Sequence, residues 1–219
     1  YSGSAYVFSL QSGAWMQSTK LLASDGATHD HFGFSVAVSP GLVAVGAYGH
    51  DEGAVYVYMP DTLGSWTQAQ KLQASDKGTN AYFSSSVAAS DGGTVVVGAP
   101  SYNDPKGSVY VFSCTAGVCT ETNVLHATDE AMGDDFGTSV AMSCSTIVVG
   151  APADKDRGHG SGSVYVFAHQ LAGGWVQTTK IAPTDVAKKN YFGYSVAISA
   201  HTVAAVTYGG SPGSAYVKE

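Results

Sequence analysis

Short apolar runs alternate with polar, glycine-rich segments along the whole chain. One run, Gly-Ser-Ala-Tyr-Val-Phe, opens the chain and returns four times with small changes, at starts near residues 3, 53, 107, 162 and 213. β-branched and aromatic residues at this density favour strands, and no stretch shows the 3.6-residue period of an amphipathic helix. The pattern predicts an all-β chain of 219 residues, forming a single domain built from repeats of about fifty residues.

Two further markers recur in each repeat. A Phe-Gly or Phe-Ser pair precedes Ser-Val-Ala at Phe32, Phe83, Phe136 and Phe192. An apolar run then ends in Gly-Ala at Gly46, Gly98 and Gly150, and the last repeat has Val206 at this place. With the Tyr-Val-Phe strand and a fourth strand around Lys-Leu, each repeat predicts four strands. Four antiparallel strands in about fifty residues are typical of one β-propeller blade.

The Phe-Gly and Gly-Ala-Pro motifs, in this order and spacing, resemble the FG-GAP repeat family, which includes the propeller head of integrin α subunits. The resemblance covers essentially the whole chain. It implies a non-catalytic adhesion, protein-binding or assembly module that is extracellular or at the cell surface. A carbohydrate-binding lectin, a different class of function, is the alternative, and an enzyme is the third choice.

Family propellers usually close with seven blades, whereas this chain predicts two outer strands, three full blades and three inner strands. We therefore expect an arc of a larger propeller, with a closed four-bladed ring as the alternative. An arc leaves apolar blade faces bare, so further blades or another chain should cover them. Because the chain opens at Tyr1, directly before a strand, we expect a processed chain or a piece of a longer one.

Integrin-type repeats often carry a calcium loop, Asp-x-Asp-x-Asp-Gly, between the first and second strands. The corresponding turns of this chain contain one carboxylate, that of Asp91. Calcium needs six to eight oxygen ligands, several of them carboxylates. We expect neither a cofactor nor this calcium site, and we identify no other metal site in the sequence, although the recurring Asp residues leave cation binding as an alternative.

The net charge of −7, from 17 acidic and 10 basic residues, disfavours nucleic-acid partners. No apolar run approaches the ~20 residues that span a bilayer. The negative charge is concentrated in the connections between second and third strands and between fourth and first strands. These connections share one edge of the blades, here called the loop face; the hairpin turns form the opposite turn face.

Variable connections on a rigid scaffold are where binding is usually found. The expected partner, a protein or a glycan, should therefore dock on the loop face; the alternative is that its charge only maintains solubility. The candidate residues are Asp51, Glu52, Asp104, Asp134, Asp135, Asp154, Asp156 and Arg157.

Other candidate residues recur in every repeat, which favours structural roles. The same position of each repeat holds an aspartate, and we expect an Asx-type turn there rather than catalysis. These aspartates are Asp25, Asp76, Asp129 and Asp185. Trp15, Trp66 and Trp175 likewise share a position after the third strand. They could stack on sugars, but their periodicity favours packing between blades. No motif indicates a catalytic residue.

The third repeat has Cys119 where the other repeats have this tryptophan, and Cys114 lies across the same hairpin. We predict a disulfide between Cys114 and Cys119, within a Cα separation of about 4.4–6.8 Å. It would compensate for the lost tryptophan contacts.

Overall fold

A computed structural model describes residues 2–50, 52–76, 82–100, 106–170, 173–210 and 213–218. This part of the chain contains strands and no helix. In chain order the strands are β1 (Ala5–Gln11), β2 (Ala14–Leu21), β3 (Ser35–Ser39), β4 (Leu42–Ala47), β5 (Ala54–Pro60), β6 (Trp66–Leu72), β7 (Ser86–Ala89), β8 (Thr94–Ala99), β9 (Ser108–Thr115), β10 (Val118–Leu125), β11 (Ser139–Ser143), β12 (Thr146–Ala151), β13 (Ser163–His169), β14 (Trp175–Ile181), β15 (Ser195–Ser199), β16 (Thr202–Val206) and β17 (Ala215–Lys218).

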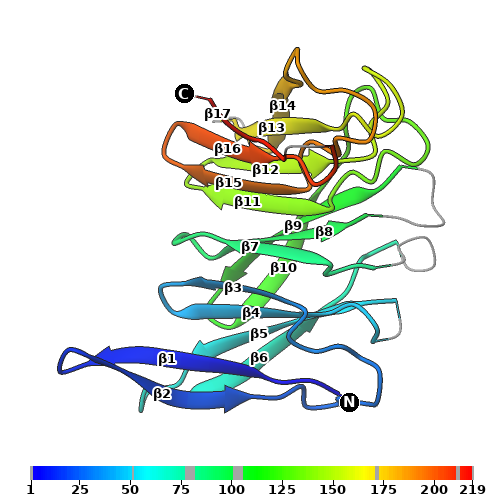
Figure 1. The fold of residues 1–219 in the computed structure, drawn as a ribbon. Coiled ribbons are helices and arrows are strands. Elements are labelled where there is room, and N and C mark those ends of the chain that lie inside the picture. The colour runs from blue at the N-terminus through cyan, green and yellow to red at the C-terminus, as the bar shows by residue number, and fades with distance from the viewer. Residues whose placement is uncertain are drawn as a thin grey trace.

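The strands form antiparallel sheets that are successive propeller blades, as the repeat predicts. Three blades are complete: β3–β6, β7–β10 and β11–β14, each with its strands in sequence order. The hairpin β1–β2 occupies the place of the two outer strands of an earlier blade, and β15–β17 supplies three inner strands of a later one. Figure 1 shows β1–β2 at one end of the stack and β15–β17 at the other, with the N- and C-termini far apart.

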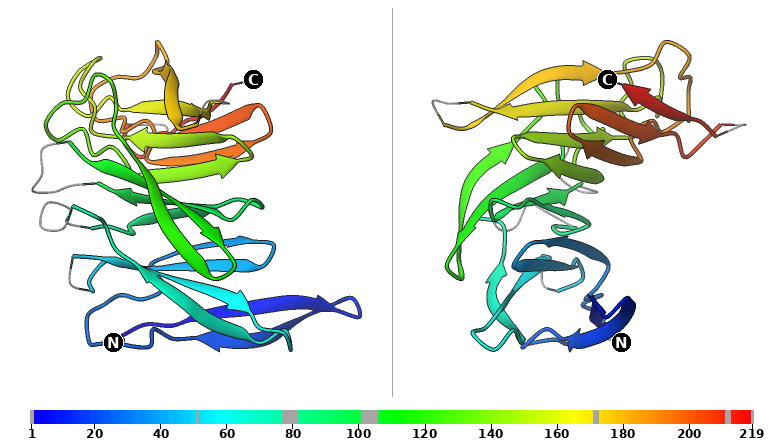
Figure 2. Two further views of the ribbon diagram at one scale, coloured as in Figure 1. Left: turned by 180° about the vertical axis from the view of Figure 1, so that it is seen from behind. Right: turned by 90° about the vertical axis from the view of Figure 1, so that its left-hand side faces the viewer.

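The stack is an open arc, not a closed four-bladed ring. The first strands β3, β7, β11 and β15 pack beside one another on its concave side, and the fourth strands lie on the outside (Figure 2). Second strands such as β4 and β12 lie between two strands of their own sheet and between neighbouring blades. Their side chains are therefore almost wholly buried, which explains their continuous apolar sequence.

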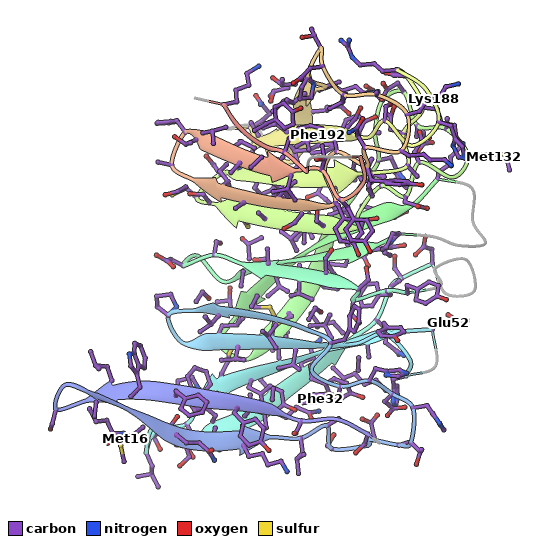
Figure 3. The ribbon with its side chains drawn as sticks, in the orientation of Figure 1. Met16, Phe32, Glu52, Met132, Lys188 and Phe192 are labelled. Atoms are coloured by element: carbon purple, nitrogen blue, oxygen red, sulfur yellow. A yellow bond between two sulfur atoms is a disulfide. The ribbon has the colours of Figure 1, made fainter. Side chains whose placement is uncertain are left out.

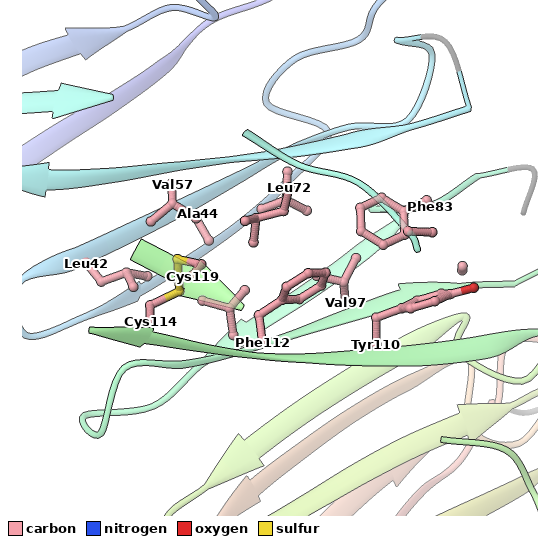
Figure 4. Packing of buried hydrophobic residues seen from close by; sticks show 14 residues of the cluster. Leu42, Ala44, Val57, Leu72, Phe83, Val97, Tyr110, Phe112, Cys114 and Cys119 are labelled. Carbon is pink, nitrogen blue, oxygen red and sulfur yellow. A yellow bond between two sulfur atoms is a disulfide. The ribbon is translucent and has the colours of Figure 1, made fainter. Parts of the chain in front are cut away.

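An apolar layer fills each joint between successive blades. Between the first two complete blades it contains Val57 and Leu72 from one side and Phe83, Val97 and Phe112 from the other (Figure 4). Similar layers join β1–β2 to the first blade, the second blade to the third, and the third to β15–β17. Each blade thus buries its two faces against different neighbours, as repeat architectures require.

The glycines of the repeat are explained by close contacts across these joints. Gly53, at the start of a third strand, has φ 103°, and a Cβ there would lie under 3 Å from the carbonyl oxygen of Phe83 in the next blade. Gly107 has the same relation to Phe136. The glycine of Gly-Ala-Pro is equally restricted, because a Cβ on Gly98 would collide with the carbonyl oxygen of Gly137.

A serine hydroxyl also joins each blade to the next. In the Phe-Gly-x-Ser motif, Ser35 Oγ donates to Ser84 O at 2.6 Å, and Ser86 Oγ donates to Gly137 O at 2.9 Å. Ser139 Oγ donates to Gly193 O at 2.8 Å. The repeated motifs are therefore mainly the contact residues of the joints.

Cys114 and Cys119 form a disulfide across the β9–β10 hairpin. Their Cα atoms are 3.9 Å apart, shorter than the expected range, because the two residues are direct cross-strand partners. The bridge lies in the apolar layer that faces the preceding blade (Figure 4). Cys144 is a free, exposed thiol.

The tryptophans at the equivalent place pack between blades where a preceding blade is present. Trp66 contacts the layer shared with β1–β2, and Trp175 contacts the layer shared with the second complete blade. Trp15, whose sheet has no preceding neighbour among the described residues, is 70 % exposed.

Candidate functional site

The loop face lies along one edge of the stack. Figure 3 places Glu52, Met132 and Lys188 on this edge and Met16 on the opposite, turn-face side. Of the candidate residues there, Glu52, Asp156 and Arg157 are exposed and Asp135 is half-buried. Asp51 and Asp104 lie outside the described residues.

Two of the expected surface carboxylates, Asp154 and Asp134, are instead buried, at 2 % and 5 % exposure. Asp154 accepts hydrogen bonds from Tyr165 Oη at 2.9 Å and from the Asp156 N–H at 2.9 Å, and its Oδ2 lies 2.9 Å from Lys180 Nζ. Burial alone would raise the pKa of Asp154, but these partners outweigh it and lower the pKa. The side chain joins the loop to the blade, so it cannot contact a partner directly.

Asp134 caps the loop before Phe136. Its Oδ2 accepts the Ala131 N–H at 2.9 Å, while its buried Oδ1 has no hydrogen-bond partner. Burial raises the pKa of Asp134 despite the Ala131 hydrogen bond, and the nearby Asp154 carboxylate raises it further. In the first complete blade the residue equivalent to Asp154 is His50, whose Nδ1 lies 2.7 Å from Asp30 Oδ2. The third blade thus has two buried carboxylates where the first has a histidine–aspartate pair.

The recurring aspartates Asp25 and Asp76 have structural contacts with the following blade. Asp25 accepts a hydrogen bond from Tyr56 Oη and Asp76 accepts one from Tyr110 Oη, both at 2.7 Å and both from the following blade. Lys71 Nζ also reaches Asp25 at 2.8 Å. The lysine and tyrosine hold the pKa of Asp25 at about 2. At a later position of the repeat, a side-chain oxygen accepts a hydrogen bond from the backbone N–H three residues earlier. The residues at this position are Asp30, Asp134 and Asn190.

An aromatic pocket of about 420 Å³ opens on the concave side of the arc, where the Phe-Gly and Gly-Ala-Pro segments of all four repeats converge. Repeats one, two and four contribute aromatic rings, repeats two and three contribute smaller groups, and repeat three contributes a carboxylate. The lining residues that the argument uses are Phe34, Tyr48, Tyr82, Asp135, Tyr194 and Tyr208.

The rings of the aromatic pocket form two groups. Phe34 meets Tyr48 edge-on with ring centroids 4.5 Å apart, and Tyr48 lies 5.7 Å from Tyr82. Tyr194 stacks on Tyr208 at 4.3 Å. Phe34 is 59 % exposed and Tyr208 is 70 % exposed, so both groups present ring surface to a ligand.

Among the described residues, Asp135 is the acidic residue that lines the aromatic pocket. Burial raises its pKa, and the adjacent Asp134 raises it further, whereas Lys155 lowers it. A carboxylate among aromatic faces is suited to a cation, because the ring faces and the carboxylate all attract positive charge.

The sequence reasoning selected Asp135 for its charge but missed the rings around it. The signal was present in the variable positions of the motifs. The residue after Phe-Gly is Phe34 or Tyr194, and the residue after Gly-Ala or its equivalent is Tyr48 or Tyr208. These positions change from repeat to repeat, so the repeat pattern alone marks them as spacers, yet the fold brings them together on the concave side.

The described residues contain no group of three or more His, Cys, Asp or Glu side chains that could hold a metal ion. Within the same ranges, no helix is long and apolar enough to cross a membrane.

No curated protein matches the chain. The family model described as FG-GAP repeat matches it four times, over residues 15–58, 66–112, 119–167 and 175–218. Each match runs from the fourth strand of one blade to the third strand of the next, and so includes one joint. The chain therefore belongs to the FG-GAP repeat family.

Proposed function

We propose that this protein is a non-catalytic, extracellular adhesion or protein-binding module whose partner docks on the loop face and inserts a cationic side chain into the aromatic pocket. The observation that carries the proposal is the aromatic pocket itself, with Asp135 among exposed rings. Tyrosines are enriched at protein interfaces because they combine a large apolar surface with a hydroxyl group. The net negative charge of the chain favours a basic partner and speeds its encounter.

A glycan is the second candidate ligand. Ser85, Thr138 and Asp135 line the aromatic pocket together with the rings. Ring platforms beside hydroxyl and carboxylate groups also suit a sugar, whose C–H face stacks on an aromatic ring while its hydroxyls form hydrogen bonds. The described lining of the aromatic pocket, with six aromatic residues and one carboxylate, nevertheless favours a cation.

The test uses two blocked tripeptides that differ in charge and hardly in shape, Gly-Arg-Gly and Gly-citrulline-Gly. Binding is followed by NMR titration at low salt. We expect the arginine peptide to bind about tenfold more tightly than the citrulline peptide. Phe34→Ala and Asp135→Asn should each remove most of that difference.

Leu63→Ala is the matched control, because Leu63 is 90 % exposed in a hairpin turn on the turn face. It should leave binding unchanged. Equal binding of the two peptides would contradict the cation. Recognition of sugars on a glycan array, lost on Phe34→Ala, would instead establish the lectin alternative.

A further inference from the structure

We propose that Lys155 is a specificity-determining residue of the aromatic pocket. Its ammonium group offsets the charge of Asp135, so that the pocket takes an arginine guanidinium group in preference to a lysine ammonium group. This role rests on the proposed function, in which the pocket binds a cationic side chain. It adds which cation is selected and which residue of the chain selects it.

Lys155 lies in the connection between β12 and β13 and folds back over the loop that carries Asp135. Its Nζ donates a hydrogen bond to Met132 O at 2.5 Å. The same atom lies 3.6 Å from the place that a Cβ on Gly133 would take, two residues before Asp135. Burial raises the pKa of Asp135, and the positive charge of Lys155 acts against that rise.

The two lysines of the third complete blade have different partners. Lys180 Nζ lies within ion-pair distance of three carboxylates, those of Asp129, Asp154 and Asp156. The hydrogen-bond partner that the structure describes for Lys155 is a neutral backbone carbonyl. The positive charge of Lys155 is therefore left to act on the carboxylates of the neighbouring loop.

The acid of the pocket and this lysine occur in the same repeat. The residue before the phenylalanine of the Phe-Gly motif is acidic in the third repeat, as Asp135, and its equivalents are His31, Tyr82 and Tyr191. A lysine at the position of Lys155 is likewise confined to the third repeat, and its equivalents are Asp51, Asn103 and Ser211. The paired departure from the other repeats indicates that the two side chains act together.

The two candidate cations differ in what they need from a site. An ammonium group is compact and strongly hydrated, so a carboxylate with its full charge must offset its loss of water. A guanidinium group is planar and more weakly hydrated, and it stacks on aromatic faces. With Lys155 beside Asp135, the rings supply most of the attraction, and the pocket therefore favours arginine.

The test compares blocked Gly-Arg-Gly and Gly-Lys-Gly by NMR titration at low salt, with Gly-citrulline-Gly as the uncharged reference. We expect the wild type to bind the arginine peptide more tightly than the lysine peptide. Lys155→Gln should strengthen binding of the lysine peptide about threefold and that of the arginine peptide less, so that the ratio of the two affinities falls. Lys155→Arg keeps the charge and should keep the wild-type ratio.

Lys188→Gln is the matched control, because it removes an equally exposed positive charge elsewhere on the loop face (Figure 3). It should leave the ratio unchanged. Double variants identify the partner of Lys155. In an Asp135→Asn background, Lys155→Gln should no longer change the ratio, whereas in an Asp134→Asn background it should still do so. Circular dichroism establishes that every variant is folded.

Three results would overturn the role of Lys155. They are a ratio that Lys155→Gln does not change, an equal change caused by Lys188→Gln, and an effect that survives Asp135→Asn but not Asp134→Asn. Wild-type protein that binds the arginine and lysine peptides equally, and both more tightly than the citrulline peptide, would refute the selection and leave the proposed function standing. Equal binding of all three peptides would refute both.

Discussion

Glycine is required at the joints for two separable reasons, a positive φ and the close approach of a neighbouring blade. Gly137 shows both: its φ is 94°, and a Cβ would lie 2.7 Å from Ser108 O. Gly64 shows only the first, with φ 81° in an open hairpin turn and no atom within 4 Å of the added Cβ. The difference between the losses in free energy of unfolding that alanine causes at the two positions therefore isolates the contribution of close packing.

We predict that Gly137→Ala lowers the free energy of unfolding by about 3 kcal/mol, and Gly64→Ala by about 1 kcal/mol. Urea denaturation followed by tryptophan fluorescence measures both. Similar losses at the two positions would mean that the joint relaxes around the added methyl group.

Asp134 should destabilise the protein at neutral pH. Its folded-state pKa is raised by burial, so the folded state holds the proton more tightly than the unfolded chain does. Stability linked to this group is therefore present at low pH and is lost as pH rises from the unfolded value through the raised one. Asn190, at the same place in the last repeat, shows that an amide keeps the cap, because its Oδ1 accepts the Ala187 N–H at 2.6 Å.

Asp134→Asn should accordingly increase the free energy of unfolding by about 1 kcal/mol at pH 7. The gain should shrink towards zero as pH falls and the wild-type carboxyl is protonated. Denaturation curves between pH 8 and pH 4 test this, with Asp91→Asn in an exposed turn as the control. A gain that does not change with pH would exclude the charge as its cause.

At the scale of strands and hairpins, the disulfide replaces the stabilising role of a tryptophan. In the third complete blade Trp175 packs edge-on to His169, with ring centroids 5.1 Å apart, and the two are cross-strand partners. Cys119 and Cys114 hold the same two positions in the second blade. A covalent bond fixes the hairpin there without the aromatic contact.

Replacing both Cys114 and Cys119 by serine should lower the free energy of unfolding by about 2 kcal/mol, the chain-entropy value for a loop this short. Cys144→Ser should have no such effect because that thiol is exposed and free. Mass spectrometry of non-reduced fragments identifies the bridge directly. A free thiol at Cys114 or Cys119, or a bridge to Cys144, would refute the pairing.

The strands themselves were predictable because the same strand pattern recurs in each repeat. Tyr56, Tyr110 and Tyr165 occur at the same place in three repeats and are all buried, so a single misreading would have been corrected by the other copies. The aromatic pocket was not predictable in this way. Its residues are the ones that differ between repeats, and their proximity follows from how the blades converge, which no single repeat encodes. Burial of Asp154 was missed for a related reason, since its partner Lys180 lies in a different strand of the blade.

At the scale of the whole molecule, stability should fall from the middle of the arc towards its ends. The second strands β4, β8 and β12 are buried between neighbours, whereas in β17 only Tyr216 is partly buried and Val217 is 68 % exposed. In repeat proteins, each unit is stabilised mainly by its neighbours. Hydrogen exchange should therefore be slowest in β8 and fastest in β1 and β17. Uniform protection along the chain would indicate that the ends are covered in solution.

The charge of the loop face should control how fast a basic partner associates. Glu52 and Asp156 are exposed there. Replacing both by their amides should slow association with a four-arginine peptide and flatten its dependence on salt, because long-range attraction between exposed charges is screened by ions. Stopped-flow fluorescence measures the rates. An unchanged salt dependence would assign the acidic charge to solubility alone.

Equivalent contacts at successive joints make the blades interchangeable. Gly53 meets Phe83 as Gly107 meets Phe136, and in both contacts the phenylalanine carbonyl oxygen is the nearest atom to the added Cβ. A chain from which residues 83–135 were deleted would bring Gly53 against Phe136 without leaving a partner unmatched. The protein could therefore lose or duplicate a whole blade through an ordinary gene rearrangement and still fold, so that blade number in such proteins can change in single steps while the contacts between blades stay as they are.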